Sequence, residues 1–215
     1  MIITISRQAA SRGDLVARRT AERLGLPLIN PEVVARAALR LGLHREDLSS
    51  PERAERLGER LARIALDMAG EPADDPDWAL APLPSMYEAG YRRVIETMIL
   101  RLAAEHSVVI AGFPAQVLLR EPGRAIHALV VAPLATRVQR MMLREDVQRP
   151  LAERVVRESD RDRVEFYRRL YGVQWDEPTL YDCVLNTARL TIEEAAEVII
   201  IAARGLYGAA AVAAR

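Results

Sequence analysis

The chain is 215 residues long, 50% hydrophobic and 28% charged, which is ordinary for a globular protein that buries a sizeable core without cross-links. Its 30 basic residues, all of them arginines, balance 30 acidic ones, so the zero net charge disfavours nucleic acid or a membrane surface as a partner. The single Cys183 excludes an internal disulfide, and the lack of a leader pattern or a membrane-spanning apolar run predicts a cytoplasmic protein.

The first 25 residues predict a strand, a loop and a helix. The isoleucine-rich run over residues 2–6 is nearly continuous, as in a strand buried on both faces of a parallel sheet. Apolar positions over residues 16–24 recur at helical spacing and stop at Gly25. The loop between these elements lies where α/β proteins hold phosphate with backbone N–H groups and the positive end of a helix dipole.

The residues of this loop depart from the P-loop pattern, which requires two glycines around four residues, then Lys, then Ser or Thr. Gly13 would be the second glycine, but Asp14 stands in the place of the lysine and Leu15 in that of the hydroxyl residue. The location of the loop therefore predicts phosphate binding, whereas its chemistry is incomplete.

The next segment is mainly helical. A short strand over residues 26–30 ends at Asn30, which predicts an N-cap and a helix to about residue 41. A second start signal at residues 49–52 precedes a helix that ends near residue 70. Residues 71–84 are rich in proline and aspartate and are expected to form a mobile loop. The 51–70 helix carries one apolar stripe, formed by Leu57, Leu61, Ile64, Ala65 and Met68.

The remaining elements alternate between helix and strand. A C-terminal helix is expected to begin with a capping box at Thr191 and to continue through Ala202. The alanine-rich tail after Gly205 is expected to fray. The other expected helices are 87–105, one that begins at Pro133, and 151–170; the expected strands are 107–112, 126–132 and 183–186.

Five strands alternating with helices predict an α/β fold, with a parallel sheet covered on both faces in a single domain. Ligands of such sheets bind beyond the carboxyl ends of the strands. Loops 7–14, 30–32 and 112–116 are therefore expected to meet at one edge of the sheet. The arginine-bearing segments 137–144 and 154–168 would close over them.

These two segments carry charged residues at helical spacing. One face presents three guanidinium groups, which suit phosphate because guanidinium binds it bidentately. The alternative is a solvated face with pairs such as Glu153 with Arg157. The three histidines form no ligand pattern, so no metal site is predicted. The residues that share a face are Arg137, Arg140 and Arg144 on the first segment, and Asp160, Arg163 and Tyr167 on the second, with Arg157 one turn before Asp160.

Several segments together resemble the cytidylate kinase-like proteins. The opening MIITISRQAASRGDLVARRTAERLG is similar to the family's isoleucine-rich strand, Ser-Arg, glycine-rich loop and helix. The similarity continues in residues 26–32, 108–112 and 132–137, and it is strongest in residues 158–167 and 175–190. It extends to about residue 204.

The resemblance implies a three-layer P-loop nucleoside monophosphate kinase fold. A helical monophosphate-binding insertion would lie at about residues 31–86 and a lid at about residues 144–168. The implied activity is transfer of the γ-phosphoryl group of ATP, with Mg²⁺, to a pyrimidine monophosphate such as CMP or dCMP. Small-molecule nucleotides would be the partners, and the apolar stripe of the 51–70 helix is a candidate interface for a homodimer.

The resemblance also implies a set of site residues. ATP would contact the loop after the first strand and the arginines of the 133–144 segment. The acceptor would contact the end of the second strand and the 154–168 segment. The implied catalytic residues are Arg12, Arg157, Asp160 and Arg163; those implied for ATP are Ala10, Ser11, Arg12, Gly13, Asp14, Arg137 and Arg144; those implied for the acceptor are Asn30, Asp160, Arg163 and Tyr167.

Three loops depart from the family pattern. Residues 10–14 replace a Gly-Ser-Gly-Gly loop followed by a basic residue, residues 112–114 replace a Gly-Arg-Gly-like turn, and Asn30 replaces an aspartate. Arg12 adds bulk where backbone approaches phosphate, although it is also a candidate for the missing charge, and Asp14 adds a like charge. Phosphoryl transfer depends on positioning and charge neutralisation. An active or weakened kinase, a pseudokinase that senses nucleotide or binds a partner, and a scaffold that binds no nucleotide therefore all stay open.

Overall fold

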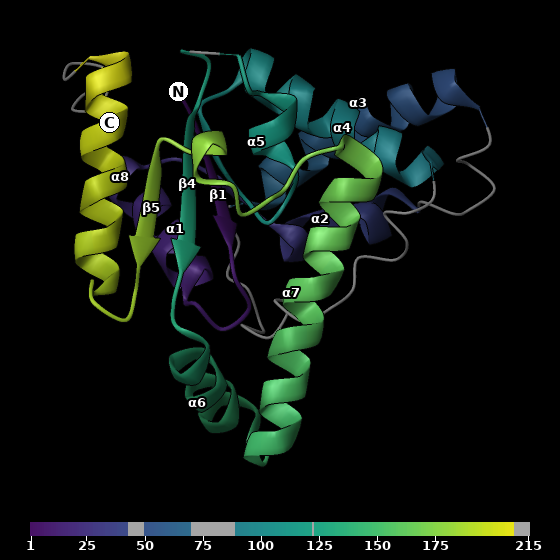
Figure 1. The fold of residues 1–215 in the computed structure, drawn as a ribbon. Helices are drawn as coiled ribbons and strands as arrows, with labels where there is room; N and C mark the ends of the chain where they lie inside the picture. Colours follow the sequence, from purple (N-terminus) through teal and green to yellow (C-terminus); the bar gives the residue numbers. More distant parts are fainter. Residues whose placement is uncertain (43–49, 70–88, 122, 209–215) are drawn as a thin grey trace.

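The computed structural model describes residues 1–42, 50–69, 89–121 and 123–208. They contain a five-stranded sheet in the order β2-β3-β1-β4-β5, and every strand pairing is parallel (Figure 1). The prediction of an α/β fold with a parallel sheet is confirmed. The strands are β1 (Ile2–Arg7), β2 (Leu28–Ile29), β3 (Val108–Ala111), β4 (Ile126–Val131) and β5 (Cys183–Asn186).

Several helices begin or end where the local chemistry predicts. Gly25 ends α1 in the left-handed conformation with φ of 61°, Asn30 caps α2 by accepting from the backbone N–H of Val33, and Thr191 forms a capping box with Glu194. The helices are α1 (Gly13–Leu24), α2 (Pro31–Leu41), α3 (Pro51–Met68), α4 (Ala89–Glu105), α5 (Ala115–Leu118), α6 (Leu134–Glu145), α7 (Arg149–Tyr171) and α8 (Ile192–Tyr207).

Helices cover both faces of the sheet, because alternate residues of each buried strand point to opposite sides. Ile3 and Ile5 of β1 pack with α1 and α8 in one hydrophobic cluster. Ile2 of β1 and Ile110 of β3 belong to a second cluster with α2, α3 and α4. The near-continuous isoleucine run of the sequence therefore reflects burial on two sides, as predicted.

The apolar stripe of α3 is used inside the chain. Leu61 and Ala65 are fully buried, and they belong to the same cluster as Ile95 and Met98 of α4, with which α3 packs most extensively. The stripe that made α3 a candidate homodimer interface therefore faces α4.

The C-terminal helix is longer than predicted, and two other predicted segments lie outside the described residues. Helix α8 continues through Gly205 to Tyr207, because the Tyr207 hydroxyl bonds to the backbone of Ile2 and to the carbonyl of Arg124. The expected 71–84 loop and most of the alanine-rich tail lie outside the described residues. No helix in the described ranges is long and apolar enough to cross a membrane.

The carboxyl ends of the strands share one edge of the sheet, and α6 and α7 extend beyond it (Figure 1). The loop between β1 and α1 lies at this edge, beside the residues that follow β3, β4 and β5. This is the edge at which ligands bind in open α/β sheets.

Candidate phosphate-binding site

The loop between β1 and α1 has a backbone conformation suited to anions. The φ angle is positive at Ala10 (56°) and Arg12 (64°) but not at Ser11 or Gly13, so the sign of φ alternates over four positions. Such alternation turns successive backbone N–H groups toward one concave face, the nest with which P-loops hold phosphate. Helix α1 begins directly afterwards with no side-chain cap at Arg12, so its dipole adds positive potential at the nest.

This conformation is kept although glycine is absent where φ is positive. A left-handed residue other than glycine costs about 1–2 kcal/mol. Neighbouring groups hold the strained loop in place: the Ser11 N–H donates to the Gln8 carbonyl at 3.2 Å, and the Ser11 carbonyl accepts from the Thr187 hydroxyl. The nest is therefore formed with no glycine at either residue of positive φ.

Ser11, a residue of the nest, carries a buried polar group. Its side chain is fully buried, and its Oγ has no hydrogen-bond partner among the described residues. A buried hydroxyl left without a partner costs about 1–3 kcal/mol. A phosphate oxygen bound in the nest would supply that partner, so the residues present fit a phosphate group.

Arg7, the last residue of β1, runs across the mouth of the loop. It is 8% exposed, and its Nε forms an ion pair with Asp14 in the first turn of α1. A Cβ atom at Gly13 would overlap the Cβ of Arg7, and one at Gly112 would overlap its guanidinium. The two glycines thus make room for this arginine between the start of α1 and the end of β3.

Arg163 of α7 approaches the same place from the other side. It donates to the Arg7 carbonyl, and its guanidinium carbon lies 5.1 Å from the centre of the Trp175 ring, within the range of a cation–π contact. Burial, and secondarily the charge of Arg7, lower the pKa of Arg163. Tyr167, one turn further along α7, is buried in a cluster with Leu129 and Trp175.

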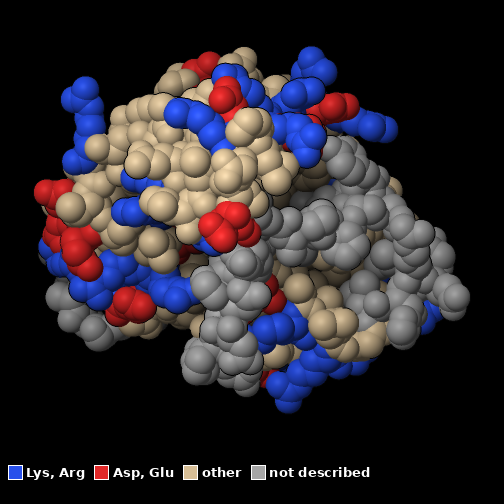
Figure 2. Space-filling model, turned by 90° about the horizontal axis from the view of Figure 1, so that it is seen from below, with Lys and Arg blue, Asp and Glu red and all other residues tan. Residues whose placement is uncertain are grey.

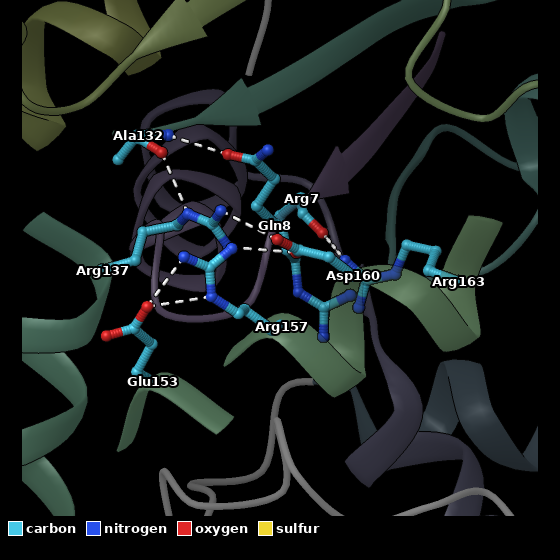
Figure 3. Close-up of polar contacts among 8 residues, drawn as sticks. All are labelled: Arg7, Gln8, Ala132, Arg137, Glu153, Arg157, Asp160 and Arg163. Carbon is cyan, nitrogen blue, oxygen red and sulfur yellow. Dashed lines mark hydrogen bonds and ion pairs between the residues drawn. The ribbon is translucent and has the colours of Figure 1, made fainter. Parts of the chain in front are cut away.

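Arg137 links α6 to α7. Its Nη1 and Nη2 donate to Oδ1 and Oδ2 of Asp160 at 3.0 and 2.8 Å, and its Nε donates to the carbonyl of Ala132 at 2.9 Å. Figure 3 shows this pair beside Arg7 and Arg163. The structure thus brings together Arg137, Asp160 and Arg163, which sequence spacing had placed on two separate helix faces.

A second pair of arginines lies on the β5 side of the nest. Arg140 donates to the carbonyl and the hydroxyl of Thr187 at 2.7 and 3.0 Å and more weakly to the Ala10 carbonyl at 3.5 Å. Burial, followed by the charge of Arg12, lowers the pKa of Arg140. The loop is therefore flanked by two pairs of like charges, Arg12 with Arg140 and Arg7 with Arg163, which an anion would stabilise.

Three of the implied site residues have local roles in this structure. Arg157 pairs with Glu153 at 2.7 Å and its side chain is 56% exposed, the solvated pairing that the sequence offered as the alternative. Arg144 pairs with the adjacent Glu145, and the Asn30 side chain caps α2. On the face seen from the strand ends, arginines and carboxylates are interspersed (Figure 2).

The described residues offer no Mg²⁺ site of their own. No three His, Cys, Asp or Glu residues within them converge on a metal position. Asp14 is engaged by Arg7 and Asp160 by Arg137, and Leu15 replaces the P-loop hydroxyl and is 45% exposed. A Mg²⁺ ion would have to be held by substrate phosphates and water, as is common for this ion.

Sequence reasoning gave no role to three residues that shape the site. Arg7 ends a buried strand, Gln8 accepts from the Ala132 N–H, and Thr187 bonds to Ser11 and Arg140. Polar residues directly after apolar strands are a usable signal, because those strands all end at one edge. The contacts among them depend on how the sheet and α6 are packed together.

Comparisons with known proteins agree with this geometry. The chain is 26% identical over 194 residues to a cytidylate kinase of Methanothermobacter thermautotrophicus, covering 90% of this chain and 99% of that one. It is 29% identical over 204 residues to a cytidylate kinase of Aeropyrum pernix, covering 93% and 97%.

Two solved structures share the fold. An uncharacterized protein of Eubacterium ventriosum superposes with a TM-score of 0.60 at 21% identity, covering 94% of this chain and 97% of the other. A shikimate kinase of Acinetobacter baumannii in complex with shikimate gives 0.50 at 15% identity, covering 95% and 93%. The second likeness indicates a P-loop kinase type of fold. Residues 2–189 match the cytidylate kinase-like family, and the chain belongs to that family.

Proposed function

We propose that the protein is a nucleoside monophosphate kinase-like phosphotransferase that moves the γ-phosphoryl group of ATP to a pyrimidine nucleoside monophosphate. The observation that carries this proposal is the nest at residues 10–13, in which Ala10 and Arg12 have positive φ although neither is glycine, and in which the Ser11 hydroxyl has no hydrogen-bond partner among the described residues. Strain retained at one loop is typical of a functional site. The cytidylate kinases among the relatives support the choice of acceptor.

In this proposal the nest and the amino end of α1 hold the donor phosphates. Arg12 and Arg140 flank the nest and neutralise charge on the polyphosphate, with Arg144 further along α6. ATP supplies the phosphoryl group, and the protein contributes position and electrostatic stabilisation, which provide most of the catalysis in phosphoryl transfer. Any Mg²⁺ would be carried with the nucleotide.

The acceptor is assigned to the β2–β3 side of the nest. Asn30 directly follows β2, and residues 31–86 would provide the monophosphate-binding insertion. Residues 144–168 would act as a lid that carries Arg157, Asp160 and Arg163. Asp160 would orient Arg137, and Tyr167 would support the lid from the cluster it forms with Trp175.

A pseudokinase is the second candidate. It is favoured by Asp14, whose negative charge lies at the start of α1. It is also favoured by the contacts that Arg137 and Arg163 already make within the chain, with Asp160 and with the Arg7 carbonyl. Such a protein would bind nucleotide in the nest and change shape without transferring phosphate.

The test is a coupled assay for ADP formed from ATP and Mg²⁺, run with each common nucleoside monophosphate, beside calorimetry of ATP binding. We expect turnover with CMP or dCMP above the ATPase background. Binding of ATP without turnover on any acceptor would favour the pseudokinase, and the absence of both would contradict the two candidates together.

A further inference from the structure

We propose that Arg7 supplies the cation that the phosphate loop lacks at position 14, and that Asp14 positions its guanidinium. The proposal rests on the proposed function only in taking the bound anion to be a nucleotide phosphate. The charge would thus come from the end of β1 rather than from the first turn of α1, with Asp14 retained as the partner that orients it.

The Arg7 side chain crosses Gly13 and ends over Gly112. A Cβ atom at either glycine would overlap it. Gly13 begins α1 and Gly112 follows β3. Since β1 lies between β3 and β4, the guanidinium lies at the carboxyl edge, between the nest and the loop after β3.

The contacts of Arg7 fix the orientation of this cation. The Asp14 carboxylate pairs with Nε, whereas Nη1 is the atom that lies against Gly112. A guanidinium carries five N–H donors in one plane, so a carboxylate that holds the Nε edge orients the remaining donors. In this arrangement Asp14 acts on a phosphate through Arg7.

The charge of Arg163 also acts at this place. Arg163 donates to the Arg7 carbonyl, and the charge of Arg7 is among the causes that lower the pKa of Arg163. Two cations thus share a partly buried place, in which Asp14 forms an ion pair with Arg7. A phosphate group there would receive charge-assisted hydrogen bonds and relieve the repulsion between the two arginines.

Arg12, the other candidate for the missing charge, is less well placed. Its side chain is exposed, and its charge acts on Arg140, on the β5 side of the nest. Arg7 instead lies at the junction between donor and acceptor loops, where the P-loop lysine reaches the transferred phosphate in kinases of this fold type.

The experiment measures binding of inorganic pyrophosphate and of ATP by calorimetry, which requires no turnover. We expect Arg7→Gln to weaken both at least tenfold, and Arg7→Lys to recover part of the loss. The double variant Arg7→Gln/Asp14→Arg returns the cation to the loop and should restore affinity. Arg12→Gln should lose less than Arg7→Gln, and Arg18→Gln, an exposed arginine on α1, is the matched control without effect.

A second test distinguishes an Asp14 that orients Arg7 from an Asp14 that only stabilises the fold. In the native background Asp14→Asn should weaken pyrophosphate binding about threefold, because Arg7 loses its orientation. In the Arg7→Gln background the same change should strengthen binding, because only repulsion remains. Such a reversal of sign requires that Asp14 acts through Arg7.

Thermal unfolding of each variant separates an effect on binding from an effect on folding. If Arg7→Gln does not fold, the affinities of Arg7→Lys and Asp14→Asn test the proposal instead. Native affinity in folded Arg7→Gln, or a larger loss in Arg12→Gln, would overturn the proposal. Turnover by the native protein that Arg7→Gln leaves unchanged would also overturn it and leave the proposed function standing. If the variants lose affinity for pyrophosphate as expected but the native protein shows no turnover, the role of Arg7 stands and the proposed kinase activity is rejected.

Discussion

Arg137 and Asp160 form a bidentate ion pair that joins α6 to α7, with nitrogen–oxygen distances of 3.0 and 2.8 Å. The two side chains are 5% and 29% exposed. Removing one partner leaves the other charge poorly solvated, so we expect Arg137→Gln to lower the free energy of unfolding by about 2–3 kcal/mol. Urea denaturation followed by circular dichroism measures the change.

The matched control for this prediction lies on α7, the helix that carries Asp160. Arg157 pairs with Glu153 within one turn, and its side chain is 56% exposed. Arg157→Gln should change stability by about 0.5 kcal/mol or less. Equal losses in the two variants would show that burial does not decide the strength of these pairs.

Ser11→Ala should make the protein more stable and its phosphate binding weaker. The Ser11 Oγ is buried without a partner, so its removal relieves an unfavourable desolvation of about 1–3 kcal/mol. A phosphate in the nest would lose the same hydrogen bond. Thermal unfolding and pyrophosphate titration measure the two effects. Ser6→Ala is the control: Ser6 is also buried but has a hydrogen bond with Tyr181, so stability should fall.

Arg12→Gly should stabilise the fold, because Arg12 has φ of 64° and its side chain is exposed. Relief of the left-handed conformation gives about 1–2 kcal/mol, and the greater freedom of glycine in the unfolded chain offsets about 0.4–1 kcal/mol. Ala9→Gly, at a neighbouring residue whose φ is not positive, should destabilise by about 0.5–1 kcal/mol. A loss of stability in Arg12→Gly would mean that its side chain has a structural role in the loop.

The protein should lose stability below neutral pH through His127. Its Nδ1 lies 2.6 Å from the Thr4 hydroxyl and its Nε2 lies 3.2 Å from the Leu119 carbonyl, a pairing that suits a neutral ring. Burial lowers the pKa of His127. Because the folded state holds the proton less tightly than the unfolded state, this contribution is complete above about pH 6.5. It is lost as the pH falls from there through the folded pKa.

Urea unfolding between pH 5 and 7 measures this dependence. His127→Gln should reduce the slope of stability against pH across that range, whereas His106→Gln, at an exposed position, should not. An unchanged slope in His127→Gln would assign the acid sensitivity to other groups.

The order of the strands and of the longer helices was predictable because each of these elements carries its own signal, whereas the four-residue α5 was not predicted. Continuous isoleucines predicted the buried β1, helical spacing and Gly25 predicted α1, and the capping box at Thr191 predicted the start of α8. The end of α8 was not predictable, because Tyr207 is held by Ile2, at the opposite end of the sequence.

The site was predictable only in part. The position of the loop after β1 follows from its place between a strand and a helix, and Arg137 and Asp160, both predicted as site residues, lie together beside Arg7 and Arg163. Their mutual pairing was not foreseen, because it depends on how α6 packs against α7. The roles of Arg7 and Gly112 were missed for the same reason, since the contact between them exists only once β1 and β3 are side by side.

The contact between Arg163 and Trp175 gives the protein a built-in optical probe. Trp175 is almost fully buried, and a cation lies 5.1 Å from the centre of its ring, where it affects the excited state of the indole. If a nucleotide draws Arg163 toward its phosphates, the emission of Trp175 changes without any added label. The rate of that change in a rapid-mixing experiment would report when α7, which carries Arg163, responds to the nucleotide.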